Sequence, residues 1–311
     1  MLSLRFASRC ILLLLASLLV GAAHAQRTVN LLHAPTGTER GEASRDALAP
    51  LAESFTFDRN LIFFEAMVDG SPGNFILDTG APTLVMNNRG SAGSGSNYTG
   101  YGSGGSVALT DHRVNLFEMG GLTVENYWAI GIDLRGMENR VGQRIDGMVG
   151  YELLNDGELR IDYAARSFRL LPSERHPKHL GVAPRAVLKF SMVDHLPVVR
   201  FRIKGKRYAF AIDTGAGSNL VDSKAAEGLQ LADTGEAMNI LGLDGRHVEA
   251  AIVSLPTPGE FAEGEETIEL VTMDLSHLQE EGHELAGILG SAFLSQFTVG
   301  IDYRRRKIYV W

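Results

Sequence analysis

The sequence predicts an all-β protein made of two similar β-barrel lobes with a few short helices. Two observations support this prediction. One sequence unit occurs twice along the chain, and apolar residues in both copies alternate with polar ones as in β-strands. The composition agrees, because 45% hydrophobic residues and 35 glycines among 311 residues are typical of a globular, turn-rich chain.

The duplication is visible as two segments that align without a gap. Residues 61–81 lie over residues 196–216 at a constant offset of 135, and both segments end in Asp-Thr-Gly-Ala. Two shorter matches follow at an offset of 140, residues 147–150 over 287–290 and the Ile-Asp-Tyr of 161–163 over 301–303. Chance does not give several ordered matches at nearly constant spacing, so the chain contains two copies of one unit.

The periodicity within each copy is that of strands. Val199, Phe201 and Ile203 alternate with arginines, which places the apolar side chains on one face of a sheet. Gly70 and Gly205 then mark the turns of two equivalent hairpins.

Helices are expected at only two places. Residues 223–228 predict one short helix that ends at a glycine. Phe293, Leu294 and Phe297 have the spacing of an apolar helix face and predict a second helix after Gly290.

Five segments are expected along the chain. Residues 1–25 have the pattern of a signal peptide, and residues 26–53 form a polar lead-in with little pattern, for which flexibility and removal as a propeptide both stay open. The first lobe is expected at 54–172 and the second at 187–311. The stretch from Pro172 to Arg185 contains three prolines and mixed charge, so residues 173–186 are predicted to be a linker.

The signal peptide predicts export to the periplasm or the medium, with a cut after Ala25. Its apolar run is shorter than the roughly 20 residues of a membrane span, so no stable membrane insertion is expected after cleavage. Cys10 is the only cysteine and lies within the signal, which excludes disulfides and cysteine-ligated metal in the mature chain.

Each copy carries an apolar strand that leads directly into Asp-Thr-Gly. A buried acid is costly unless it is hydrogen-bonded or functional. Two equivalent loops that meet at a pseudo-twofold axis would bring Asp78 and Asp213 together, and the pair would then hold one shared proton. The ionised member can activate a water, and the protonated member can donate to a substrate carbonyl. The residues expected to support the two loops are Thr79, Gly80, Thr214 and Gly215.

These motifs resemble those of the aspartic peptidases, in particular the retropepsin-like family of bacteria. Each Asp-Thr-Gly-Ala is followed later in its copy by a hydrophobic-hydrophobic-glycine element, at 148–150 in the first and 288–290 in the second. The resemblance covers both lobes and implies a retropepsin/pepsin-like fold with the active site in the cleft between the lobes. It implies an aspartic endopeptidase that acts on a peptide or protein and needs no metal or cofactor. Because both halves lie in one chain, a monomer should suffice.

The resemblance also implies a flap, a β-hairpin that closes over bound peptide. The corresponding stretches are glycine-rich, at 98–107 in the first lobe and 240–248 in the second. The residues expected to contact substrate there are Tyr98, Tyr101, Gly102, Gly242 and Gly245.

An alanine, Ala81 or Ala216, follows each Asp-Thr-Gly, where pepsin-like members have serine or threonine. A hydroxyl at this position would stabilise the ionised carboxylate, so its absence should leave the pKa of the pair higher. We therefore expect a mildly acidic rather than a strongly acidic pH optimum.

Two rival functions stay open: a catalytically inactive peptide-binding relative, and a non-enzymatic β-rich surface protein. Intact Asp-Thr-Gly in both copies argues against the first, and the second leaves the paired acids unexplained. The formal net charge is −8 and the only basic run, 304–307, predicts a hairpin turn, so no nucleic-acid partner is expected. The dinucleotide-like glycines of 100–105 lack a strand-to-helix context, and His277 and His283 lack a metal-binding spacing.

Overall fold

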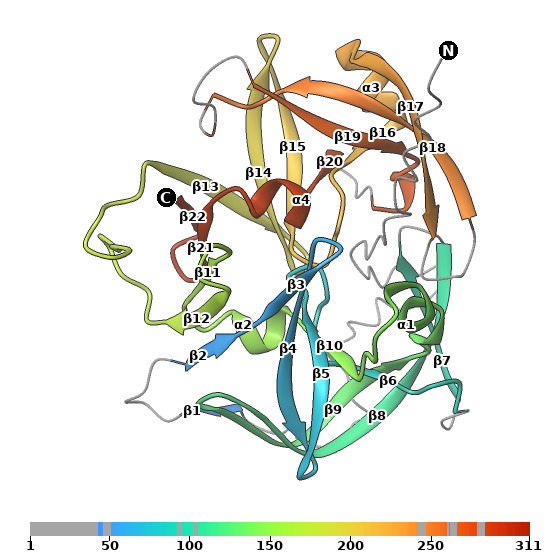
Figure 1. Cartoon of the computed structure of the whole chain (residues 1–311), viewed down its shortest axis with the longest axis vertical. Helices are drawn as coiled ribbons and strands as arrows, with labels where there is room; N and C mark the ends of the chain where they lie inside the picture. Colours follow the sequence, from blue (N-terminus) through green and yellow to red (C-terminus); the bar gives the residue numbers. More distant parts are fainter. Residues whose placement is uncertain are drawn as a thin grey trace, which may run out of the picture.

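The structure is a computed structural model, and it is predominantly β with two similar lobes, as predicted (Figure 1). It describes residues 43–45, 51–91, 95–102, 105–241, 247–259, 261, 266–278 and 284–311. In Figure 1 the first lobe, coloured blue to green, lies below the second lobe, coloured yellow to red.

The first lobe contains a sheet that closes on itself. Across the sheet its strands are β1 (Ala43–Arg45), β9 (Leu122–Ile132), β6 (Val85–Asn87), β10 (Gly147–Val149), β5 (Ser71–Leu77), β4 (Leu61–Val68), β8 (Gly105–Met119) and β7 (Gly95–Gly102), with β3 (Thr56–Asp58) paired to β4. β8 pairs with β9 as well as with β4, which closes a barrel.

A second, longer sheet joins the two lobes. Its order is β17 (Ala232–Leu241), β18 (His247–Pro256), β19 (Thr267–Met273), β16 (Leu220–Asp222), β20 (Leu285–Gly290), β15 (Lys206–Asp213), β14 (Leu196–Ile203), β13 (Ala186–Val193), β22 (Lys307–Val310), β21 (Thr298–Asp302), β11 (Glu158–Asp162), β12 (Ser167–Leu171) and β2 (Leu51–Ser54). The antiparallel pairing of β11 with β21 brings the ends of the two copies together in one ladder.

The internal duplication recurs as a repeat of elements, because β4 to β12 are followed in the same order by β14 to β22. β5 is parallel to β10 as β15 is to β20, and β6 is antiparallel to β10 as β16 is to β20. The predicted hairpins are confirmed: Gly70 and Gly205 have φ of 77° and 81° in the β4–β5 and β14–β15 turns. The basic run 304–307 spans the turn of the β21–β22 hairpin and the start of β22, also as predicted.

The described residues contain four helices, all short. They are α1 (Arg135–Val141), α2 (Tyr151–Leu154), α3 (Ser223–Leu229) and α4 (Ser291–Leu294), with a 3₁₀ turn at Ser276–Leu278. α3 and α4 confirm the two predicted helices, although α3 ends at Leu229, one residue past Gly228, and Phe297 lies beyond the end of α4. Gln230, with φ of 50°, caps α3. The sequence pattern did not predict α1 or α2. In the described part of the chain, no helix has the length and apolarity that crossing a bilayer requires.

Strand periodicity determines which side chains form the core. Val199, Phe201 and Ile203 are buried, whereas Arg200 and Arg202 between them are exposed, as the alternation predicts. Aromatic rings fill much of the space between the strands. This packing holds β5 and β15, whose ends carry the two aspartates.

Candidate active site

The two Asp-Thr-Gly loops begin where β5 and β15 end. Each loop is supported by the strand that pairs in parallel with β5 or β15, which is β10 or β20. The Asp78 amide donates to the Val149 carbonyl at 3.0 Å, and the register of β15 with β20 places Asp213 opposite Gly290. A β-carbon on Gly150 would lie 2.3 Å from the Ala81 carbonyl oxygen, so only glycine fits there. The predicted hydrophobic-hydrophobic-glycine elements therefore do pack against the loops.

The threonines of the two loops bond reciprocally across the boundary between the lobes. The Thr79 amide donates to Thr214 Oγ1 at 3.0 Å, and the Thr214 amide donates to Thr79 Oγ1 at 3.0 Å. Each hydroxyl donates in turn to a strand carbonyl of the other lobe, Thr79 to Ile212 at 3.3 Å and Thr214 to Leu77 at 2.8 Å. All these groups are buried, so the four bonds are fully sequestered from water.

The two aspartates face each other as the duplication predicts. Asp78 is 4% exposed and Asp213 is fully buried, and a side-chain hydrogen bond links them. Each carboxylate also accepts the amide of its own glycine at 2.8 Å, Asp78 from Gly80 and Asp213 from Gly215. A β-carbon on Gly80 would lie 2.5 Å from the Asp213 carboxyl carbon, so the glycine lets the opposite acid approach.

Burial controls the ionisation of this pair. It raises the pKa of Asp78 from 3.8 to about 6, although the hydrogen bonds from Asp213 and from the Gly80 and Ala81 backbone act in the opposite direction. Two linked carboxyl groups titrate as a unit, so the pair retains one proton well above the pH at which an exposed aspartate loses it.

A family model described as aspartyl protease matches the chain twice, at residues 64–153 and 199–293. The chain belongs to the aspartyl protease family. The two matched segments contain one Asp-Thr-Gly loop each, together with the glycine element that supports it. A comparison with curated proteins found no match.

Two further contacts support the loops from across the lobe boundary. His195 Nε2 bonds to the Gly80 carbonyl at 2.7 Å, and Asn60 Nδ2 donates to the Gly217 carbonyl at 3.0 Å. The carbonyl can only accept, so His195 carries a proton on Nε2. Burial lowers the pKa of His195. Sequence reasoning missed both residues, although the offset of 135 aligns His195 with Asn60, two side chains that can donate an N–H.

The Ile-Asp-Tyr repeats also contribute a contact beneath the loops. The Tyr163 hydroxyl lies 3.2 Å from Ser291 Oγ, which donates to the Thr214 carbonyl at 3.0 Å. The equivalent tyrosine, Tyr303, packs edge-on against the ring of Tyr151 at 5.4 Å instead. Each tyrosine thus contacts the first helical residue of the other copy, and burial raises the pKa of both tyrosines.

The predicted flap residues are only partly within the described structure. Tyr98, Tyr101 and Gly102 lie in β7, which forms a hairpin with β8, and nothing is described of their side chains. Gly242 and Gly245 lie outside the described residues, between β17 and β18. Their role as substrate contacts stays a prediction.

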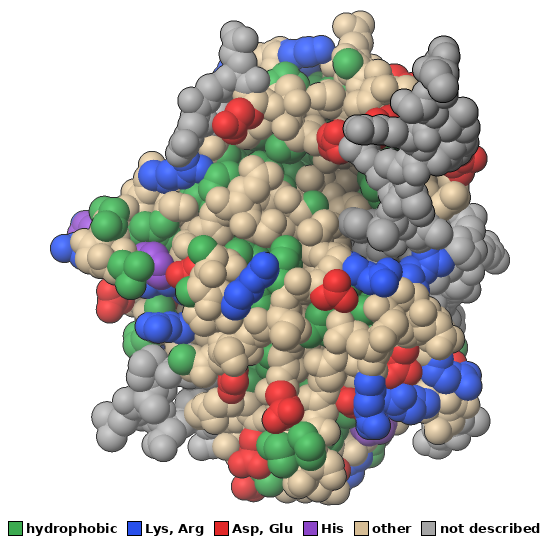
Figure 2. Space-filling view, viewed as in Figure 1, with side chains coloured by type: hydrophobic (Ala, Val, Ile, Leu, Met, Phe, Trp, Pro, Cys, Tyr) green, Lys and Arg blue, Asp and Glu red, His purple; other side chains and the backbone are tan. Residues whose placement is uncertain are grey.

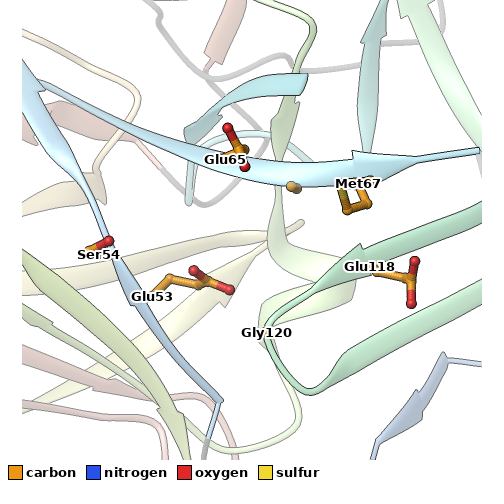
Figure 3. A pocket seen from close by; sticks show the side chains of 7 residues that line it. Glu53, Ser54, Glu65, Met67, Glu118 and Gly120 are labelled. Atoms are coloured by element: carbon orange, nitrogen blue, oxygen red, sulfur yellow. The ribbon is translucent and has the colours of Figure 1, made fainter. Parts of the chain in front are cut away.

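A cavity of about 470 Å³ lies on the first lobe, and no residue of either Asp-Thr-Gly loop lines it (Figure 3). Figure 3 shows Glu53, Glu65 and Glu118 around it. Burial raises the pKa of Glu53. Across the described ranges, no group of three or more His, Cys, Asp or Glu side chains is arranged to hold a metal ion. The candidate active site is the aspartate pair, because its two carboxyl groups are buried and coupled to each other.

The reciprocal threonine bonds predict a specific loss of stability. Replacing Thr79 with valine leaves the Thr214 amide and the Ile212 carbonyl buried without their partner, which should lower the free energy of unfolding by about 1–3 kcal/mol. Thr79→Ser keeps the hydroxyl and is the matched control. Urea denaturation of both variants measures the difference, and equal stability of the two would contradict it.

His195 should be replaceable only by another N–H donor. We expect His195→Leu to lose about 1–3 kcal/mol of stability, because the Gly80 carbonyl then lacks its donor. His195→Asn should recover part of that loss, since Asn60 at the equivalent position reaches across the lobes. The test is the thermal midpoint of each variant, and a leucine variant as stable as the asparagine variant would exclude a hydrogen-bonding role.

Proposed function

We propose that the chain is an aspartic endopeptidase in which Asp78 and Asp213 are the catalytic pair. The observation that carries this proposal is the hydrogen bond between two buried carboxyl groups at the meeting point of the two lobes. Two carboxyl groups that are buried in contact with each other cannot both ionise, so the pair holds one proton over a wide pH range. The family membership supports proteolysis as the class of reaction.

The proposed mechanism needs only water and the two carboxyl groups. The ionised carboxylate accepts a proton from a water, whose oxygen attacks the peptide carbonyl carbon. The protonated carboxyl donates to the carbonyl oxygen, which gives a tetrahedral diol without a covalent bond to the enzyme. The carboxyl group that took the proton from water then donates it to the nitrogen, the C–N bond breaks, and a diol hydroxyl returns a proton to the other carboxylate. The amides of Gly80 and Gly215 hold the carboxylates in fixed orientations throughout.

Substrate would bind as an extended strand. Such a peptide can add to β7 or to β17, each of which is the last strand of its sheet among the described residues, because main-chain hydrogen bonds to a strand edge do not depend on sequence. The substrate class is therefore a peptide or an unfolded protein segment, and one chain supplies both halves of the site. We further propose that residues 1–25 direct export to the periplasm or medium, with residues 26–53 as a lead-in and lobes at 54–172 and 187–311.

Substitution of either aspartate tests the catalytic assignment. Asp78→Asn and Asp213→Asn should each reduce cleavage of a peptide library by at least about 10²–10⁴-fold, because the pair loses its general base or its general acid. Wild-type cleavage should also be sensitive to pepstatin. Unchanged circular dichroism spectra show that both variants fold. Wild-type protein that binds peptides without cleaving them would favour the inactive relative, and activity in either variant would refute the pair.

The raised pKa of Asp78 predicts a pH dependence with a definite sign. The shared proton is lost as the pH rises through about 6, so kcat should peak at mildly acidic pH and fall above it. The folded state also holds this proton more tightly than the unfolded chain, whose aspartate has a pKa of 3.8. Stability from this group is therefore fully present below pH 3.8 and is lost as the pH rises through about 6.

Two measurements check this pH dependence. A pH–rate profile should show the fall above about pH 6, and a peak below about pH 3, where pepsin's pair works, would contradict it. Urea denaturation across the same window should show stability falling with pH in the wild type. That contribution should be absent in Asp78→Asn, which has no proton to lose at this position.

A further inference from the structure

Three large hydrophobic side chains stand out from the surface of the described residues, and all three lie within eight positions of the chain. Leu180 is 88% exposed, Val182 63% and Val187 50%. Leu180 also has φ of 49°, a left-handed conformation that costs a leucine energy and that asparagine or glycine adopts readily. The turn therefore holds an exposed leucine at a position where neither folding nor solubility favours one.

This loop is anchored, so the apolar side chains are held outward. His179 and Val182 exchange two backbone hydrogen bonds at 2.9 Å, and Trp311 Nε1 donates to the Val182 carbonyl at 3.0 Å. Arg160 donates to the Lys178 carbonyl at 2.8 Å. In Figure 2, hydrophobic, basic and histidine side chains gather at the left edge together with acidic ones, where Figure 1 places the loop that leads into β13.

A row of cations lies on the face of β13, β14 and β15 that also bears Val187. Val187 and Lys189 are exposed two residues apart and so share one face of β13. Lys189 is next to Arg200 in register, because Phe190 pairs with Val199. Arg202 lies directly opposite Arg207 on β15, and all four cations of the row are exposed.

The row is energetically unfavourable for the fold itself. Like charges directly opposite each other in an antiparallel pair are destabilising, and within the described residues Arg202 and Arg207 form no ion pair. The first lobe shows that the fold does not need them, because the offset of 135 places Glu65, Met67 and Pro72 at the positions of Arg200, Arg202 and Arg207. The chain as a whole has a net charge of −8, yet this face concentrates cations that the fold does not need. The face therefore indicates an anionic partner.

We propose that this face is a docking surface for an anionic lipid bilayer. The surface consists of Leu180, Val187, Lys189, Arg200, Arg202 and Arg207. Protruding aliphatic side chains beside a row of lysine and arginine match the boundary between acyl chains and charged head groups, where the first insert and the second bind phosphates. This goes beyond peptide hydrolysis, because none of the six residues belongs to the Asp-Thr-Gly loops.

Two substitutions separate binding from folding. Leu180→Asn replaces the strained leucine with a residue that suits the left-handed turn, and Arg202→Gln relieves the repulsion with Arg207. Both variants should therefore be at least as stable as the wild type. Met67→Gln, at the position equivalent to Arg202 in the first lobe, is the matched control.

The experiment is cosedimentation of the full chain with lipid vesicles. One set of vesicles is phosphatidylcholine alone, and the other is equal parts phosphatidylcholine and phosphatidylglycerol. All variants carry the same N-terminus, so that any binding by that segment is equal among them. We expect binding to the anionic vesicles that weakens with salt, by about fivefold in Arg202→Gln and about tenfold in Leu180→Asn, with Met67→Gln unchanged. Cleavage of a soluble peptide should be equal in all four proteins.

Three outcomes would overturn the proposal. The first is equal binding to neutral and anionic vesicles, and the second is unchanged binding in both Leu180→Asn and Arg202→Gln. The third is tighter binding to polyglutamate than to anionic vesicles, with no effect of Leu180→Asn, which would indicate an acidic protein partner instead. Loss of proteolysis does not enter these readouts, so the bilayer proposal and the proposed activity fail separately.

Discussion

The structure depends on keeping two carboxyl groups side by side in a place that water barely reaches. Burial disfavours the charge on Asp78 and Asp213, and the mutual hydrogen bond together with the amides of Gly80 and Gly215 offsets that cost. Each lobe can supply only one carboxyl group and one amide. The arrangement therefore exists only when both lobes meet at the correct distance, and the rest of the fold serves to fix that distance.

Two connections between the lobes fix it from different directions. Near the carboxyl groups, the reciprocal bonds of Thr79 and Thr214 tie loop to loop, and His195 and Asn60 each reach across to a loop carbonyl. Farther away, β11 pairs with β21 in one continuous sheet. A hinge motion that broke only one of these connections would leave the other in place, so the relative position of the two carboxyl groups is overdetermined.

The sequence could predict whatever the duplication repeats. Alignment of the two copies predicted the aspartate pair, the hairpins at Gly70 and Gly205, and the two glycine elements below the loops. It could not predict that His195 bonds to Gly80, because the acceptor is a backbone carbonyl whose position depends on the folded loop.

Other features left no local signal in the sequence. α1 has no side-chain cap at its start, and so nothing in the usual capping pattern marks it. β2 pairs with β12, a strand far away along the chain. Neither hydrophobic periodicity nor turn residues can predict such a long-range pairing. These features arise from tertiary contacts that override local preference.

Duplication also explains where the two copies have diverged. Residues near the pseudo-twofold axis are constrained by their partner across it, so the Asp-Thr-Gly-Ala loops are identical in both copies. Away from the axis a residue is constrained only by contacts within its own lobe. There the copies differ in charge, since the first lobe has Glu65 where the second has Arg200. A two-lobed chain can thus keep a symmetric reaction centre and still present two unlike outer faces, an option that a symmetric dimer of identical chains does not have.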